Sequence, residues 1–454
     1  MNSAETEKTV SNWQTNPKIV LPVLLAVMLL LVLQLFYFIN QNAVNILFSD
    51  QWDLYQPLFR GASDHEIFFS QVGQLRLGLG GLFSKYIAIF TDWDTRAESL
   101  ALGGVMILNA LLAIYLKRRL FGQLTVWDFL IVVSCLGLPQ IQAPIIVAFP
   151  SHGILPLFLV LVYGICLTFQ NFKLKLAALA FVAFLATFTG WAVFLGFISP
   201  VIFLIFAFKT KESRERVFAG LAFLTSVCSI AGYFYRYEFL GGVDCFTFPH
   251  YPFTDYWLFM AKLFSNTVML LCGRKTFLWE FFGSVIILMM LGTVVWSLWR
   301  IFRTPDSDAK PFVFLTFIAF SMMFGAMSAI GRVCVDVCIA DSERYQPLLV
   351  PAWLAFIFSI YLLPKNWLKT VMFSLLILGC LILPESRQKI YAQDIRGITE
   401  LKRKWRDCYL RIENAEACDR ETDFKIFLPV ESKFAQDRID FLKERKLNFF
   451  ANSR

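Results

Sequence analysis

The sequence predicts an all-α fold, a polytopic bundle of about eleven transmembrane helices followed by a small polar C-terminal segment. Hydrophobic residues make up 57% of the 454 residues and aromatic residues 17%, with a mean hydropathy of +0.60. A water-soluble globular protein of this length is less apolar. Charged residues stand in short stretches between the apolar runs, as expected where charge in hydrocarbon is costly. The net charge of +8 therefore indicates membrane topology and not a nucleic-acid-binding surface.

The apolar runs give the order of the predicted helices. We expect spans at residues 19–40, 98–116, 126–141, 153–169, 174–187, 191–208, 217–235, 278–298, 311–330, 346–363 and 370–384. They divide the chain into a cytoplasmic tail (1–18), a transmembrane domain (19–384) and a C-terminal segment (385–454). The first run is as long as a full span and no small-residue cleavage pattern follows it, so we expect no cleaved signal peptide.

Basic residues in the short loops predict the orientation of the helices. If the spans are threaded alternately, one side of the membrane receives the N-terminal tail, "KRR" (117–119), "KTKESRER" (209–216) and "RIFR" (300–303). By the positive-inside rule that side is the cytoplasm. The odd number of spans then places the C-terminal segment outside, in a multi-pass membrane protein.

Two cysteines of the C-terminal segment, Cys408 and Cys418, lie close together in the sequence. In an oxidising compartment they would form a disulfide, which suits a small segment with little core of its own. The alternative is two ordinary cysteines. The chain has ten cysteines in all, and we expect the others to be buried as small hydrophobic residues in the apolar runs.

Four long loops are predicted on the outer side of the membrane. We call them loop 1 (41–97), loop 2 (142–152), loop 3 (236–277) and loop 4 (331–345). The dense clusters of unusual polar residues lie in these loops, whereas the cytoplasmic loops hold little beyond the basic residues that topology needs. The sequence therefore predicts a functional site on the outer face.

Loop 1 begins with "FSDQWD", in which Asp50 and Asp53 flank Trp52. Three positions apart, the two carboxylates would share one face of a helical turn. There a carboxylate could serve as general base for a hydroxyl acceptor or hold a divalent cation, with Trp52 as a stacking wall. The alternative is a solvated flank, a helix cap and an interface anchor.

Two more candidates lie in loops 1 and 2. Arg76, in "QLRLGLGG", has the side chain best shaped to bind a phosphate, although it could equally extend to the interface. His152, in "FPSHGILP", could donate to an oxyanion or move a proton, and capping or packing is its alternative. The acidic cluster at Asp92, Asp94 and Glu98 is interpreted as the start of the second span.

Loop 4 and the start of the following span, "GRVCVDVCIADSERYQPLLVP", carry the second dense cluster. Arg332, Arg344 and Tyr345 at the mouth of a helix bundle suit a lipid-linked phosphate. The alternative is a network of ion pairs that ties helices together. Cys334 and Cys338 have the wrong spacing for a zinc-binding pair and lack partner ligands, so we predict no metal site.

These features resemble the GT-C class of integral-membrane glycosyltransferases, and more specifically its little-characterised bacterial multi-pass members. The resemblance rests on a first span followed at once by "FSDQWD", many short spans and a late "SERY" that enters a helix. It implies a polyprenyl-phosphate sugar as donor and Asp50 or Asp53 as the base for the acceptor. It also implies that Arg344 and Tyr345, with Arg332 as a further candidate, contact the lipid phosphate.

The resemblance is incomplete at Arg76, because relatives commonly carry a His-Arg pair in the first loop and this chain has "QLR". We expect an enzyme that transfers a hexosyl or pentosyl unit from a polyprenyl-phosphate donor to an envelope glycan or lipid acceptor. No cofactor is assigned, and the sequence leaves open whether a divalent cation is bound. The alternatives are a transporter or flippase of a lipid-linked glycan, for which mid-span charges and internal repeats would be expected, and a structural membrane protein.

Overall fold

The computed structural model describes residues 14–137, 149–239, 245–265, 276–304, 308–382, 385–427 and 432–451. It is about 79% helical, so the predicted all-α class is confirmed. The first part of the chain forms α2 (Pro17–Asn42), α3 (Gln51–Leu54), α4 (Gln56–Phe59), α5 (Asp64–Phe69), β1 (Gln71–Val72), β2 (Leu75–Arg76), α6 (Gly78–Phe90), α7 (Thr95–Phe121), η1 (Val126–Asp128) and α8 (Phe129–Leu136). The two strands pair antiparallel, with Gln71 opposite Arg76.

The remaining elements are helical. They are η2 (Pro150–His152), α10 (Ile154–Leu167), α11 (Phe172–Thr187), η3 (Gly190–Ala192), α12 (Val193–Lys209), α13 (Ser213–Phe234), α14 (Thr254–Ser265), α15 (Thr276–Arg303), α16 (Ala309–Arg332), η5 (Val337–Asp341), η6 (Glu343–Tyr345), α17 (Gln346–Ile360) and α18 (Asn366–Ile382). The C-terminal segment forms α19 (Glu385–Ile412), α20 (Ala415–Thr422), α21 (Ser432–Glu444) and η7 (Asn448–Phe450).

Six helices in the described part of the chain are long and apolar enough to cross a membrane, which makes this a multi-pass integral membrane protein. They are Pro17–Asn42, Thr95–Phe121, Gly190–Lys209, Ser213–Phe234, Trp279–Arg303 and Ala309–Arg332. The other five predicted spans fall on the shorter helices α8, α10, α11, α17 and α18. Of these predictions, residues 138–141 and 383–384 lie outside the described residues.

Helix α7 illustrates how local sequence sets the ends of a span. The Asp94 side chain caps its N-terminus by accepting a hydrogen bond from the Arg96 amide, so the predicted helix start is confirmed. Gly122 ends the helix with a φ of 78°, a left-handed conformation that favours glycine. Arg118 and Arg119 lie in the last turn, where positive charge is favourable to the helix dipole.

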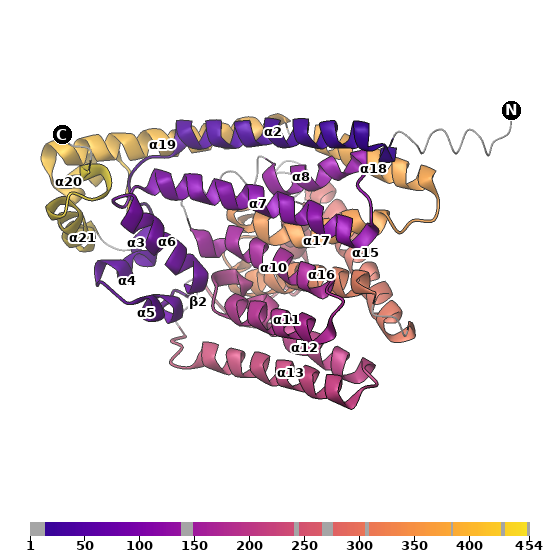
Figure 1. Cartoon of the computed structure of the whole chain (residues 1–454). Coiled ribbons are helices and arrows are strands. Elements are labelled where there is room, and N and C mark those ends of the chain that lie inside the picture. The colour runs from indigo at the N-terminus through magenta and orange to yellow at the C-terminus, as the bar shows by residue number, and fades with distance from the viewer. Residues whose placement is uncertain are drawn as a thin grey trace.

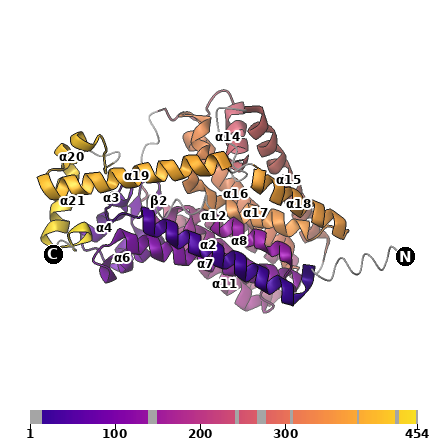
Figure 2. The same cartoon turned by 90° about the horizontal axis from the view of Figure 1, so that it is seen from above.

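The elements of loop 1 and the C-terminal segment gather at one end of the bundle. Figures 1 and 2 show α3, α4, α20 and α21 at the end opposite the N-terminus. Buried apolar residues accordingly form two clusters. The larger one fills the helix bundle, and the smaller one joins loop 1 to the C-terminal segment, from Phe48, Trp52 and Trp93 to Trp405 and Tyr409.

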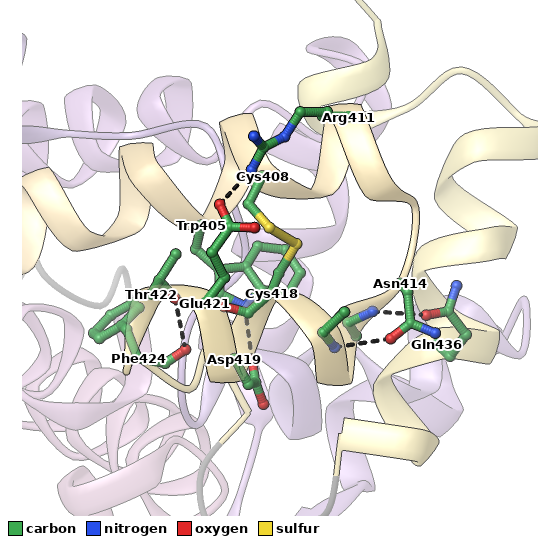
Figure 3. The surroundings of a disulfide bond; sticks show 12 residues. Trp405, Cys408, Arg411, Asn414, Cys418, Asp419, Glu421, Thr422, Phe424 and Gln436 are labelled. Carbon is green, nitrogen blue, oxygen red and sulfur yellow. Dashed lines mark hydrogen bonds and ion pairs between the residues drawn. A yellow bond between two sulfur atoms is a disulfide. The ribbon is translucent and has the colours of Figure 1, made fainter.

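Disulfides join the predicted outer loops to one another and stabilise the C-terminal segment. Cys408 and Cys418 are bonded, as predicted, and link α19 to α20 (Figure 3). The expectation that the other cysteines are small buried hydrophobic residues is wrong in part, because Cys245 of loop 3 is bonded to Cys334 of loop 4, and Cys338 is disulfide-bonded too. Cysteines far apart in sequence give no local signal of such a pairing. Cys135 and Cys166 are buried free thiols, as expected, whereas Cys228 is exposed.

Lys117, interpreted from the sequence as part of a basic cytoplasmic flank, lies in a buried ion pair. Its ammonium is 2.9 Å from Asp128, and the two side chains are 1% and 0% exposed. The Tyr361 hydroxyl donates to the same carboxylate at 2.6 Å. The centre of the Tyr361 ring lies 4.4 Å from the Lys117 ammonium nitrogen. The pair therefore ties α7, η1 and the end of α17 together.

Lys117→Met should destabilise the protein by about 3–5 kcal/mol, because it leaves Asp128 buried without its partner cation. The Lys117→Met/Asp128→Asn double variant removes both charges and should recover most of the loss. Thermal unfolding of the detergent-purified proteins measures both effects. A single variant that unfolds at the wild-type temperature would contradict a stabilising role for the pair.

Candidate functional site

Polar side chains from loops 1, 2 and 4 come together near Arg344. Asp50 stands directly before α3, after Ser49, whose φ of 53° turns the chain sharply there. Arg344, in η6, brings its Nη1 to 3.9 Å from the Asp50 carboxylate, and both side chains remain accessible, at 42% and 41% exposure. Two residues singled out separately in the sequence, nearly three hundred positions apart, are therefore brought together.

His152 of loop 2 lies beside this pair. Burial and the charge of Arg344 lower the pKa of its imidazole far below the usual value, so the ring is neutral at physiological pH. It stacks on Phe149, with ring centroids 3.6 Å apart. A Cβ on the next residue, Gly153, would lie 2.9 Å from the Pro347 side chain. This close contact fixes η2 against the start of α17, directly after Arg344.

Tyr345 lies beneath Arg344 and not beside it at the surface. Its side chain is 4% exposed and packs edge-on against Phe324 at a centroid distance of 5.4 Å. The Arg344 guanidinium carbon stands 5.3 Å from the Tyr345 ring centre, within the range of a cation–π contact. Tyr345 thus supports the arginine from below.

Asp53 has a different environment from Asp50. Its carboxylate lies 3.8 Å from Arg438 of α21, in the C-terminal segment. Burial raises the pKa of the Asp53 carboxyl, Arg438 opposes this shift and Asp50 adds to it. The two acids of "FSDQWD" therefore face different cations: Asp50 lies beside Arg344 and Asp53 beside Arg438.

Trp52 is a core residue, and its predicted role as a stacking wall is corrected. The side chain is 1% exposed and packs against Phe427 at 5.0 Å and Phe59 at 6.3 Å between ring centroids. A ring enclosed in this way has no free face to offer a sugar. The sequence suggested otherwise because an aromatic residue between two acids looks the same in a site and in a core.

Arg76 is a structural arginine, which corrects its candidacy as a phosphate ligand. It is 7% exposed, and its guanidinium donates to the backbone carbonyls of Phe69, Tyr233 and Tyr235 at 2.6 to 3.2 Å. These bonds use the donors that a phosphate would need. Arg76 therefore joins loop 1 to the end of α13.

Two further predicted features lie at helix ends. Arg332 is partly buried in the last turn of α16, where its charge is favourable to the helix dipole. Glu98, in the first turn of α7, is fully buried and accepts hydrogen bonds from Tyr55 at 2.9 Å and Ser84 at 2.5 Å. Glu98 therefore ties α7 to loop 1 through Tyr55.

Sequence reasoning missed Arg438, which contacts the backbone of Trp52 as well as Asp53. One arginine in a segment of mixed charge carries no signal that it reaches loop 1. Within the described ranges, no group of three or more His, Cys, Asp or Glu side chains is arranged to hold a metal ion. The groups available for chemistry are the Asp50 carboxylate, the Arg344 guanidinium and the neutral His152 imidazole.

Comparisons of this chain with protein-family models, curated proteins and solved structures found no match. The resemblance to GT-C glycosyltransferases thus depends on the short motifs in the sequence.

The two arginines should respond differently to substitution. Arg76→Gln should destabilise the protein by about 2–3 kcal/mol, because it leaves buried carbonyls without donors. Arg344→Gln, at an accessible pair, should stay within about 0.5 kcal/mol of the wild type. Chemical unfolding of both purified variants tests this contrast, and equal destabilisation would contradict it.

Proposed function

We propose that this protein is a membrane glycosyltransferase that transfers a sugar from a polyprenyl-phosphate donor to an envelope glycan or lipid acceptor on the outer face of a bacterial plasma membrane. The observation that carries the proposal is the accessible pair of Asp50 and Arg344. A polyprenyl phosphate needs a cation at the membrane surface, and a hydroxyl acceptor needs a base beside it.

In the proposed reaction, Asp50 accepts the proton of the acceptor hydroxyl. The hydroxyl oxygen attacks the anomeric carbon of the donor sugar, and the bond from that carbon to the phosphate oxygen breaks. The electron pair of this bond leaves with the polyprenyl phosphate, whose developing negative charge Arg344 stabilises. Tyr345 holds the guanidinium in place from beneath. His152, neutral, has one N–H to donate to the phosphate or the sugar.

The contact between Asp50 and Arg344 suggests an order of binding. Without substrate, the carboxylate and the guanidinium neutralise each other across 3.9 Å. A bound phosphate offers Arg344 a bidentate partner, and Asp50 is then released to act as base. In this account the donor binds first, so that the base is freed only when a sugar is ready for transfer.

The outer-face placement is supported by the disulfides. Cys245, Cys334, Cys408 and Cys418 all belong to loops or segments predicted on that side, and disulfides persist in oxidising compartments. A topology of eleven spans, in which the shorter helices also cross the bilayer, has the C-terminal segment on this side as well.

Mass spectrometry of envelope glycans and lipid-linked sugars tests the proposal in cells that lack the protein. One glycan should lose a sugar while its polyprenyl-phosphate donor accumulates. Wild type should restore the product, and Asp50→Asn should fail to, since loss of a general base costs about 100-fold to 10,000-fold in rate. Arg344→Gln should fail in the same way.

The matched control is Asp64→Asn, which changes an exposed carboxylate of the same loop that pairs with Lys85 and should restore the glycan. Asp53→Asn distinguishes the two possible bases. If Asp50 is the base, as proposed, Asp53→Asn should restore the product. Failure of Asp53→Asn together with restoration by Asp50→Asn would move the base to Asp53. Restoration by every variant would contradict glycosyl transfer at this site and favour transport or a structural role.

A further inference from the structure

The C-terminal segment forms hydrogen bonds with the backbone on both sides of Asp50. Before it, the Ser49 amide donates to the Ile426 carbonyl at 2.8 Å. After it, the Trp52 carbonyl accepts from Arg438 Nη1 at 2.7 Å. The short backbone stretch that carries Asp50 is therefore held at its two ends by residues almost four hundred positions later in the sequence.

Arg438 is itself held in place by aromatic rings. Its guanidinium carbon lies 5.4 Å from the ring centre of Phe427 and 5.9 Å from that of Phe59. Beyond the hydrogen bond to Trp52, it faces the Asp53 carboxylate at 3.8 Å. A planar guanidinium between rings loses little freedom when it binds a carbonyl, so it is suited to fix a loop.

Further contacts attach the C-terminal segment to both ends of loop 1. Thr399 and Arg403 of α19 donate to the carbonyls of Asn42 and Gln41 at the end of α2. At the far end of the loop, the Asn448 backbone amide donates to the Asp92 carbonyl, and the Asn448 side-chain amide donates to the Trp93 carbonyl. The Cys408–Cys418 disulfide, drawn in Figure 3 with the Trp405–Asp419 hydrogen bond beside it, joins α19 to α20 and stiffens the segment.

We propose that the C-terminal segment positions Asp50, with Arg438 as the positioning residue that fixes the backbone after it. Arg438 does not touch the reacting atoms in this account. It acts on the site through the Trp52 carbonyl. The inference concerns the site of the proposed glycosyl transfer, but the contacts that carry it do not depend on the reaction.

Thiol labelling tests the inference without assuming any activity. Asp50→Cys is placed in the full-length chain with Cys228→Ser, which removes the exposed free thiol found among the described residues, and the protein is reconstituted in lipid nanodiscs. The rate of reaction with a water-soluble maleimide is then measured with Arg438→Gln, with Arg438→Lys and with Arg411→Gln. The last is the matched control, since Arg411 pairs with Glu421 at the surface of the same segment.

Arg438→Gln should speed labelling severalfold, because the chain at position 50 is released on one side. Loss of a nearby cation alone would raise the thiol pKa and slow the reaction, so a faster rate reports mobility. Arg438→Lys keeps a donor for the Trp52 carbonyl and should recover part of the wild-type rate. A rate in Arg438→Gln that equals the rate in Arg411→Gln, or falls below it, would overturn the inference.

Glycan analysis of the same Arg438 variants separates this inference from the proposed function. If the site transfers a sugar, Arg438→Gln should lower product while Arg411→Gln does not. If labelling speeds up but Asp50→Asn still restores the glycan, the positioning role stands and the proposed function fails. If labelling is unchanged and Asp50→Asn abolishes the glycan, the function stands and the positioning role fails.

Discussion

Charge is costly in hydrocarbon, and this constraint determines where the polar chemistry of the protein lies. Two ionisable side chains that are buried in α7 have polar partners: Lys117 pairs with Asp128, and Glu98 accepts hydrogen bonds from Tyr55 and Ser84. The accessible ionic groups of the candidate site, Asp50 and Arg344, lie instead where helices end. The helical bundle therefore brings the ends of distant helices together at Asp50 and Arg344, and in the proposed function a lipid-linked substrate would present its polar group there.

The candidate site lies at the junction of two hydrophobic cores. The bundle core reaches Tyr345, directly under Arg344, and the smaller core encloses Phe48 and Trp52, which flank Asp50. Each member of the ion pair is thus anchored in a different core. The distance between Asp50 and Arg344 therefore depends on how the C-terminal segment packs against loop 1. This segment has no predicted catalytic residue, yet it contributes to the geometry of the site.

The features that sequence analysis predicted correctly have local causes. Long apolar runs predict helices, and Asp94 is a cap because of its neighbours in sequence. The pairing of Cys408 with Cys418 follows from their short separation. Trp52 and Arg76 could not be interpreted correctly, because whether an aromatic ring or an arginine faces solvent or core is decided by distant segments. The same is true of Arg438, which touches loop 1 only through the tertiary fold.

The central claim is that Arg344 binds the phosphate of a polyprenyl donor and that Asp50 gives way to it. Equilibrium binding of a short-chain polyprenyl monophosphate to the purified wild type, Arg344→Gln and Asp50→Asn tests it most directly. We predict that Arg344→Gln weakens binding by about 10-fold to 100-fold, as expected for a lost charge-assisted contact. Asp50→Asn should bind at least as tightly as the wild type, since it removes the competing carboxylate. Wild-type affinity in Arg344→Gln would contradict the account.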